Sequence, residues 1–313
     1  MMRVGNGSWP KGAILDEDGG GDKAILWIGM PVYNSLRTIA AAIDSLLAQS
    51  YGNFVLFISD NASTDGTSEL IRSYAERDPR IRHVRQAVNK GAGWNFTHVL
   101  HQADTDYFMW AAGDDFWGKD FIKDNLAALL ADPRAVVSVS RTIFVRDDGT
   151  RYPANDTAPL RGSGAANICG YLDDPSTNSR FYGIHRRRVL LSAFRQGFGE
   201  FLASDWTIMV YSLRFGTHLE VDKEQFFRHT GGRSSDGDRL IGHFRHELMT
   251  YFFPMARFTL VTLRVGSRCR SWRLMMILFR INLHFTLRRF LPGMPLLPGP
   301  VKAIIHRMAR MVS

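Results

Sequence analysis

The sequence predicts an α/β fold: a mostly parallel central sheet with flanking helices, followed by a basic helical C-terminal tail. Short apolar runs alternate with patterns of helical periodicity, which is the first observation. The composition of the 313 residues is the second, because 45% hydrophobic and 22% charged residues are typical of a folded globular protein. The third is the charge distribution. The formal net charge is +9, yet the segment from Pro254 to Ser313 holds 11 Lys/Arg and no Asp or Glu, so the rest of the chain is nearly neutral.

Strands and helices are expected in alternation through the first half. The expected elements are a strand at 24–29, a helix at 38–49, a strand at 53–59, a helix at 68–76, a strand at 81–84, a helix at 91–102, a strand at 107–112, a helix at 121–130 and a strand at 136–139. Beyond residue 145 the alternation weakens. The expectations there are an irregular region at 147–177, a helix at 198–215, short strands at 219–221 and 226–227, two basic apolar helices within 249–290 and a last helix at 301–312.

Two cysteines, Cys169 and Cys269, form neither a disulfide framework nor a metal-binding pair, so a reducing, cytosolic setting is expected. Residues 1–23 are expected to be a flexible leader, since they lack the apolar core of a secretory signal. No stretch reaches the ~18 apolar residues of a membrane-spanning helix.

A pair of carboxylates, Asp114 and Asp115, follows the expected strand at 107–112. Carboxylates near a core are costly without a cation. Magnesium is commonly held by one or two carboxylates together with substrate phosphates. The pair therefore indicates a divalent cation site, and a solvated turn that caps the next helix is the alternative.

Two further polar loops follow earlier strands. Asp60, Asn61 and Asp65 come after the second strand, where a plain turn is one explanation and recognition of a base or ribose is the other. Asn89 and Lys90 come after the third strand and precede a helix start, which offers free N–H groups for an anion. An ordinary start of a helix is the alternative there.

These motifs occur in a fixed order, each after its strand, and the order resembles that of the family-2 glycosyltransferases. The motifs are Met30-Pro31-Val32-Tyr33-Asn34, Ser59-Asp60-Asn61-Ala62-Ser63-Thr64-Asp65-Gly66-Thr67, Asn89-Lys90-Gly91 and Gly113-Asp114-Asp115. The resemblance is specific from about residue 25 to 145 and looser to about 235. It implies the A-type glycosyltransferase fold, a nucleotide-sugar donor, most simply a UDP-sugar, and Mg²⁺ or Mn²⁺.

The resemblance also implies roles for individual residues. It assigns to the nucleotide sugar Pro31, Tyr33, Asn34, Asp60, Asn61, Asp65, Asn89, Lys90 and Asp114. Asp60 would recognise the base, with Asn61 and Asp65 shaping its loop. Asp115, together with Asp114, would bind the metal, and which of the two touches the ion stays open.

In the second half, Ser204-Asp205-Trp206 resembles the motif that carries the general base of the family. Asp205 would take the proton of the acceptor hydroxyl, which suits a carboxylate whose pKa is raised by burial. Glu200 is the fallback, and an N-terminal cap of a helix is the alternative explanation. Downstream, the Arg228-His229 segment resembles one that closes over the pyrophosphate; His229 would ligate the metal or contact phosphate, and Arg233 would neutralise the leaving group.

The resulting prediction is an inverting glycosyltransferase that acts on a hydroxyl of a glycan or lipid-linked acceptor in polysaccharide or glycolipid synthesis. Residues 24–235 would be its catalytic domain, with 24–145 for the nucleotide sugar and 146–235 for the acceptor. The alternatives are an inactive sugar-nucleotide-binding or scaffold protein and, further behind, a sugar nucleotidyltransferase. A dehydrogenase is disfavoured, because no G-x-G-x-x-G follows the first strand.

Residues 236–313 form the basic region. A basic, apolar helix can lie on an anionic membrane surface, which predicts a peripheral location on the cytoplasmic face of the membrane. Packing on the catalytic domain and a dimer contact are the alternatives, and the oligomeric state stays open. No nucleic-acid partner is expected, because no RNA-binding signature accompanies the basic residues.

Overall fold

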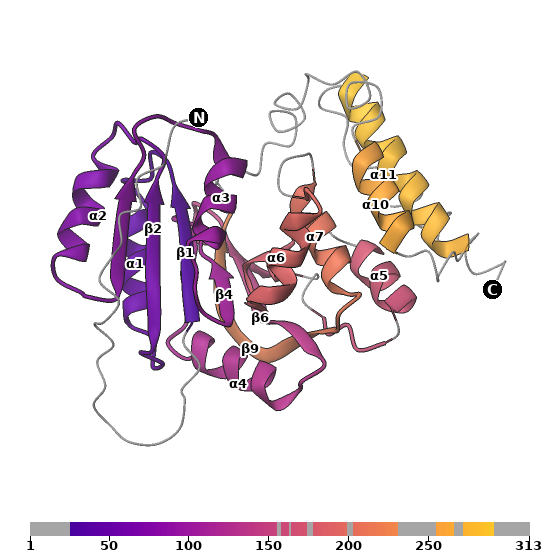
Figure 1. Cartoon of the computed structure of the whole chain (residues 1–313), viewed down its shortest axis with the longest axis horizontal. Helices are drawn as coiled ribbons and strands as arrows, with labels where there is room; N and C mark the ends of the chain where they lie inside the picture. Colours follow the sequence, from indigo (N-terminus) through magenta and orange to yellow (C-terminus); the bar gives the residue numbers. More distant parts are fainter. Residues whose placement is uncertain are drawn as a thin grey trace.

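The computed structural model describes residues 26–154, 158–162, 164–173, 178–198, 203–230, 255–265 and 272–290. Within these residues, nine strands form one sheet with helices packed on its two faces (Figure 1). The α/β fold class predicted from the sequence is confirmed. The predicted leader and the predicted helix at 301–312 lie outside the described residues.

The first half of the sheet is built from alternating strands and helices, as predicted. In chain order they are β1 (Leu26–Val32), α1 (Ile39–Leu47), β2 (Phe54–Asp60), α2 (Thr67–Ala75), β3 (Ile81–Arg85), α3 (Ala92–His101) and β4 (Tyr107–Trp110). The strand order is β3-β2-β1-β4, and all neighbours are parallel. The carboxyl ends of these four strands therefore meet at one edge of the sheet.

Strand β1 is buried on both faces because helices cover each side of the sheet. Trp27 belongs to the core on one face together with Val99 of α3, whereas Ile28 and Ile43 of α1 belong to the core on the other face. A Cβ atom at Gly29 would lie only 2.8 Å from the Val99 side chain, so the close packing of α3 on β1 depends on a glycine here. The expectation that β1 ends before Met30-Pro31 was wrong, because pairing with β2 continues to Val32.

The second half of the sheet is mixed rather than mostly parallel. Its elements are β5 (Phe116–Trp117), α4 (Phe121–Ala131), β6 (Ala135–Val145), β7 (Arg151–Pro153), α5 (Gly164–Asp173), a 3₁₀ turn (Ser179–Tyr182), β8 (Ile184–Arg186), α6 (Arg187–Arg195), α7 (Ser204–Ser212) and β9 (Thr217–His229). Strand β8 runs antiparallel to both β4 and β6, and β9 runs parallel to β6. This arrangement carries the end of β9 back to the edge where β1, β2 and β4 end.

Two expectations for the second half were wrong. The region at 147–177 holds β7 and α5 rather than only irregular chain, and the two short strands expected at 219–221 and 226–227 are parts of β9. The centre of β9 carries exposed charged residues, and its pairing with β6 shifts register at Ser140, Arg141 and Thr142. A bulge of this kind interrupts the two-residue apolar period on which the sequence interpretation relied.

In the described part of the chain after β9 there are two helices, as predicted: α10 (Ala256–Val265) and α11 (Trp272–Phe290). Helix α10 packs against α7, and α11 packs against α5 and α10 (Figure 1). Among the described helices, none is at once long and apolar enough to cross a lipid bilayer.

Candidate functional site

The predicted acidic residues gather at the shared edge formed by the ends of β1, β2 and β4. Val32, the last residue of β1, pairs with Asp60, the last residue of β2. On its other side, Val32 lies next to Gly113, since a Cβ atom there would be 3.4 Å from the Val32 side chain. Asp60 and the Asp114-Asp115 pair therefore flank the end of the same strand, as the sequence predicted.

Asp60 is fully buried and organises the turn that follows β2. Its Oδ1 accepts a hydrogen bond from the Ser63 N–H at 2.9 Å, and its Oδ2 lies 3.6 Å from Nε of Arg85. Arg85 also donates to the Ser63 carbonyl at 2.9 Å. Within the described residues, Asp60 Oδ2 is buried without a hydrogen-bond donor, and the Arg85 guanidinium is the charged group nearest to it.

The loops after β1 and β2 are joined by Asn34 and Asp65. Asn34 accepts from the Thr64 N–H at 2.9 Å and donates its own N–H to Ser63 Oγ at 2.8 Å. Asp65 accepts from the Leu36 N–H at 3.1 Å. Asn34 and Asp65 thus shape these loops. Pro31 lies within β1, and the half-buried Tyr33 follows this strand directly.

Asn61 links the β2 loop to the loop before α3. Its Nδ2 donates to Asn89 Oδ1 at 2.9 Å and its Oδ1 accepts from the Lys90 N–H at 2.9 Å. The Lys90 ammonium lies 4.1 Å from the centre of the Trp94 ring and 3.5 Å from Gln86 Oε1. The structure thus brings this motif to the site, while the phosphate contact expected of Lys90 stays a prediction.

Asp115 is buried, with 4% of its surface exposed, and lies against β9. Its Oδ1 accepts from the His229 backbone N–H at 3.1 Å, and its Oδ2 lies 3.5 Å from Nε of Arg228. Burial raises the pKa of Asp115 to about 7; the Arg228 guanidinium opposes this rise and the Asp114 charge adds to it. A buried carboxyl next to the partly exposed carboxylate of Asp114 favours a second cation close by.

Arg228 is held in an aromatic setting. Its guanidinium carbon lies 4.7 Å from the ring centre of Tyr182 and 5.6 Å from that of Phe144. Burial raises the pKa of the Tyr182 phenol, and the positive charge of Arg228 lowers it. The carboxylates that also raise it are those of Asp115, Asp205 and Asp114. Arg228 thus contacts both the Tyr182 ring and Asp115, and the 3₁₀ turn that holds Tyr182 packs against α7, which carries Asp205.

Asp205 lies in the first turn of α7, directly after Ala203 and Ser204, and it is half-buried. Its Oδ2 accepts from Nδ2 of Asn178 at 2.8 Å, and Oδ1 of Asn178 in turn accepts from the Tyr171 hydroxyl at 2.7 Å. Burial raises the pKa of Asp205, although the hydrogen bond from Asn178 acts in the opposite direction. This is the environment that a carboxylate base requires.

The donor set near Asp115 fits a hard divalent cation bound mainly through substrate and water. Apart from the Arg228 ion pair, Asp115 Oδ2 has no hydrogen-bond donor in the described part of the chain. No cluster of three or more ligating side chains occurs among the described residues, and the imidazole Nδ1 of His229 lies 3.6 Å from Asp147 Oδ1. The ligands that fit are Asp115 and Asp114, and the metal role of His229 stays a prediction. Arg233 and Glu200 lie outside the described residues.

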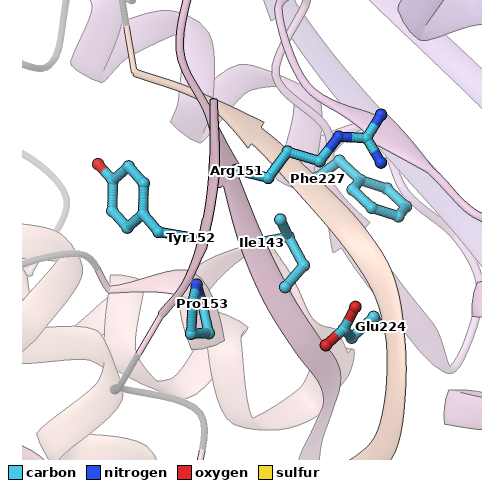
Figure 2. Close-up of a pocket in the computed structure, with 6 residues that line it drawn as sticks. All are labelled: Ile143, Arg151, Tyr152, Pro153, Glu224 and Phe227. Carbon is cyan, nitrogen blue, oxygen red and sulfur yellow. The ribbon is translucent and has the colours of Figure 1, made fainter. Parts of the chain in front are cut away.

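A hollow lies between β6, β7 and β9 (Figure 2). Its lining residues are Ile143, Arg151, Tyr152, Pro153, Glu224 and Phe227. The Phe227 ring stacks on Phe116, the residue after Asp115, at 4.8 Å between ring centres. None of the residues assigned to the nucleotide sugar or the base lines this hollow, so it is separate from the acidic cluster.

Sequence interpretation missed three residues that organise the acidic cluster: Arg228, Tyr182 and Asn178. Arg228 belongs to the segment that resembles the one closing over the pyrophosphate, but the sequence analysis gives roles there only to His229 and Arg233. Tyr182 and Asn178 come from the region that was expected to be irregular or gave no pattern. A buried asparagine at φ +43° carries no signal in a single sequence.

The fold and the gathered acidic side chains define the chain as a protein with the A-type glycosyltransferase fold. The chain belongs to the family described as Glycosyl transferase family 2, whose profile matches residues 27–195, more than half of its length. The matched region contains the motifs from β1 through Asp115, which confirms the resemblance inferred from the sequence.

Individual relatives match about a third of the chain or less. EpsE of Bacillus subtilis is 40% identical over 87 residues, which are 28% of this chain and 31% of EpsE. WfgD of Escherichia coli is named UDP-Glc:alpha-D-GlcNAc-diphosphoundecaprenol beta-1,3-glucosyltransferase. It is 29% identical over 109 residues, 35% of this chain and 42% of WfgD. The matches thus span less than half of either relative.

The structure is similar to that of TarS (residues 1–349) of S. aureus in complex with UDP-GlcNAc. The TM-score is 0.57 at 16% sequence identity, and the match covers 85% of this chain and 81% of the TarS chain. At this identity the similarity shows a shared fold.

Proposed function

We propose that this protein transfers a sugar from a nucleotide-diphosphate sugar to a hydroxyl group of an acceptor, with inversion at the anomeric carbon. The observation that carries the proposal is the placement of Asp60 and the Asp114-Asp115 pair on either side of the end of β1, with Asp115 bound by Arg228 and Asp205 bound by Asn178. Membership of the family supports a transferase. A paired carboxylate and a separate carboxylate with a raised pKa are the two acidic functions that such a transfer needs.

The transfer is a displacement at one carbon atom. The acceptor oxygen forms a bond to the anomeric carbon while the bond from that carbon to the diphosphate oxygen breaks, and the electron pair leaves with the diphosphate. The acceptor proton passes to Asp205, whose orientation is held by Asn178. Arg228 keeps Asp115 in place and adds positive charge near the departing diphosphate. A bound Mg²⁺ or Mn²⁺, held by Asp115 and Asp114, would supply Lewis-acid stabilisation of the diphosphate.

The donor in this proposal is a UDP-sugar. Asp60 and Asn34, at the ends of β2 and β1, border the place where the nucleotide would lie, and Asp60 Oδ2 can accept a hydrogen bond from a base N–H. The printed name of WfgD includes a UDP-glucose donor, and the TarS structure holds UDP-GlcNAc. Both support a uridine nucleotide here.

The acceptor in this proposal is a glycan or a lipid-linked sugar, used in polysaccharide or glycolipid synthesis on the cytoplasmic face of the membrane. The support is the name of WfgD, which specifies a sugar on a diphosphoundecaprenol. The acceptor would reach Asp205 from the side of α7 and the 3₁₀ turn, the part of the chain at 146–235 that the sequence assigned to the acceptor.

The proposal is tested with the full chain and a panel of nucleotide sugars. With Mn²⁺ present, one UDP-sugar is expected to raise the melting temperature more than GDP- and dTDP-sugars do. The same compound is expected to give metal-dependent release of UDP. Binding without release under any metal condition would instead indicate a sugar-nucleotide-binding scaffold, and no response to any nucleotide would contradict the proposal.

Asn178 is expected to act on the reaction through Asp205 as a positioning residue. Replacing Asn178 by aspartate removes the donor to Asp205 and adds a like charge, which raises the pKa of Asp205 further. Aspartate also tolerates the positive φ at this position. We expect the acid limb of the pH–rate profile to move to higher pH and the rate at pH 7 to fall about tenfold or more.

The control for Asn178→Asp is Tyr171→Phe, which removes the hydroxyl on the far side of Asn178 but leaves the hydrogen bond to Asp205. Its pH profile should stay close to that of the wild type. An unmoved acid limb in Asn178→Asp would assign Asn178 a purely structural role.

A further inference from the structure

Helix α11 is apolar on two opposite faces. Its inner face is buried against the rest of the protein through Leu274, Ile277, Leu278 and Ile281. On an α-helix with 3.6 residues per turn, the residues at 272, 275, 279 and 283 fall on the opposite side. These are Trp272, Met275, Phe279 and Leu283, which we call the outer stripe.

The outer stripe is exposed along its whole length. The exposed fractions are 60% for Trp272, 45% for Met275, 63% for Phe279 and 38% for Leu283. The stripe spans eleven residue steps, or about 16 Å along the helix axis. A contiguous exposed apolar surface of this length on a helix that is already packed by its other face marks an interaction surface.

The sequence of the C-terminal part of the chain carries charge of one sign. The chain from Pro254 to Ser313 carries 11 Lys/Arg and no acidic residue. On α10, Arg257, Leu260 and Arg264 are all exposed and follow one another at helical spacing. Arg273 and Arg280 of α11 bind Asp173 of α5, through its carboxylate and its backbone carbonyl respectively, and this fixes α11 on the body of the protein. The described parts of α10 and α11 therefore expose apolar side chains together with the basic Arg257 and Arg264.

We propose that the outer stripe of α11 lies in the interfacial layer of an anionic lipid bilayer. An apolar helix face with a tryptophan at one end, packed beside a helix with exposed Arg257 and Arg264, matches the apolar and anionic layers of such a surface. This second apolar face accounts for the exposed large apolar side chains of α11, a helix that is not long and apolar enough to cross the bilayer. One face holds the catalytic part of the protein and the other holds lipid.

The inner face of α11 connects the lipid surface to the proposed base. Trp206, which follows Asp205, packs edge-on against Phe258 of α10 and Phe285 of α11, each at 5.9 Å between ring centres. Membrane binding through the outer stripe would thus bring α7 and Asp205 close to the bilayer. Resting on the proposed function, this inference names a membrane-anchored molecule as the acceptor.

The test is co-sedimentation of the full chain with vesicles of pure phosphatidylcholine and with vesicles containing phosphatidylglycerol. We expect binding to the anionic vesicles that weakens as salt is raised, since ionic strength screens the basic residues. The double variant Trp272→Ser/Phe279→Ser is expected to lower the partition coefficient at least ~10-fold, because it removes the two largest exposed side chains of the stripe. A milder variant, Phe279→Gln, should give a smaller loss in the same direction.

The matched control is Leu130→Ser/Phe215→Ser, which removes exposed apolar side chains from the catalytic part and should leave vesicle binding unchanged. The inference is overturned if the wild type does not bind anionic vesicles, or if both stripe variants bind like the wild type. It is also overturned if the stripe variants convert a dimer into a monomer without a change in lipid binding. UDP-sugar binding is measured separately, without vesicles, and tests the proposed function. A failure of the membrane inference therefore does not imply a failure of the proposed function, and the reverse also holds.

Discussion

Replacing Asp205 by asparagine will lower the rate of sugar transfer by about 10³-fold while leaving donor binding nearly unchanged. An asparagine keeps the shape of the side chain and cannot take a proton, and general-base catalysis contributes about 10²–10⁴-fold to such rates. Donor binding is spared because Asp205 lies on α7, whereas the loops assigned to the nucleotide follow β1, β2 and β3. Single-turnover rates and donor affinity, measured on the same preparations, separate the two effects.

The pH dependence of the wild type gives a second readout for Asp205. Burial raises the pKa of Asp205, and the base is active only when ionised, so activity should be lost on acidification at a pH above the usual carboxyl range of about 4. A matched control is Asp124→Asn, because Asp124 also lies in the first turn of a helix and is bound to Lys223 outside the site. If the Asp205→Asn variant transferred sugar at the wild-type rate, Asp205 would not be the general base, and another residue would have to take this role.

The second large effect is expected for Asp115→Asn, which should abolish metal-dependent turnover, a loss of about 10²-fold or more. The neutral amide is a weak ligand for Mg²⁺ or Mn²⁺ and leaves the Arg228 guanidinium without its carboxylate partner. The rise in melting temperature that Mn²⁺ and UDP produce together should disappear in this variant. Asp78→Asn, which breaks a different Asp–Arg pair away from the site, should retain the rise.

Metal binding should also depend on pH in a defined direction. Because the pKa of Asp115 is raised to about 7, its carboxyl is largely protonated at pH 6 and ionised at pH 8 when no metal is bound. A cation must displace that proton at the lower pH, so the Mn²⁺-dependent rise in melting temperature should be larger at pH 8 than at pH 6. An equal rise at both values, or turnover of Asp115→Asn in the presence of a chelator, would rule out Asp115 as the principal ligand.

The positions of the donor-side residues were predictable because they depend on local order along the chain. The apolar runs of β1, β2, β3 and β4 form parallel strands. Because βαβ connections join these strands, the polar loops that follow them lie at the same carboxyl edge of the sheet. Asp60 and Asp115 could therefore be brought together from the sequence alone. The local period of β9 failed as a guide because a bulge and charged residues interrupt it.

The partners of these residues were decided by contacts between distant segments. Arg228 reaches Asp115 across more than a hundred positions, and the position of Asn178 beside Asp205 depends on how the 3₁₀ turn packs against α7. The two-sided nature of α11 likewise shows only when one face is seen buried on α5. Periodicity and motif order thus determined the architecture and the acidic residues of the site. Tertiary packing alone decided which charges are paired, which pKa values are raised and which apolar face stays outside, because burial and charge pairing depend on distances in space that a single sequence does not encode.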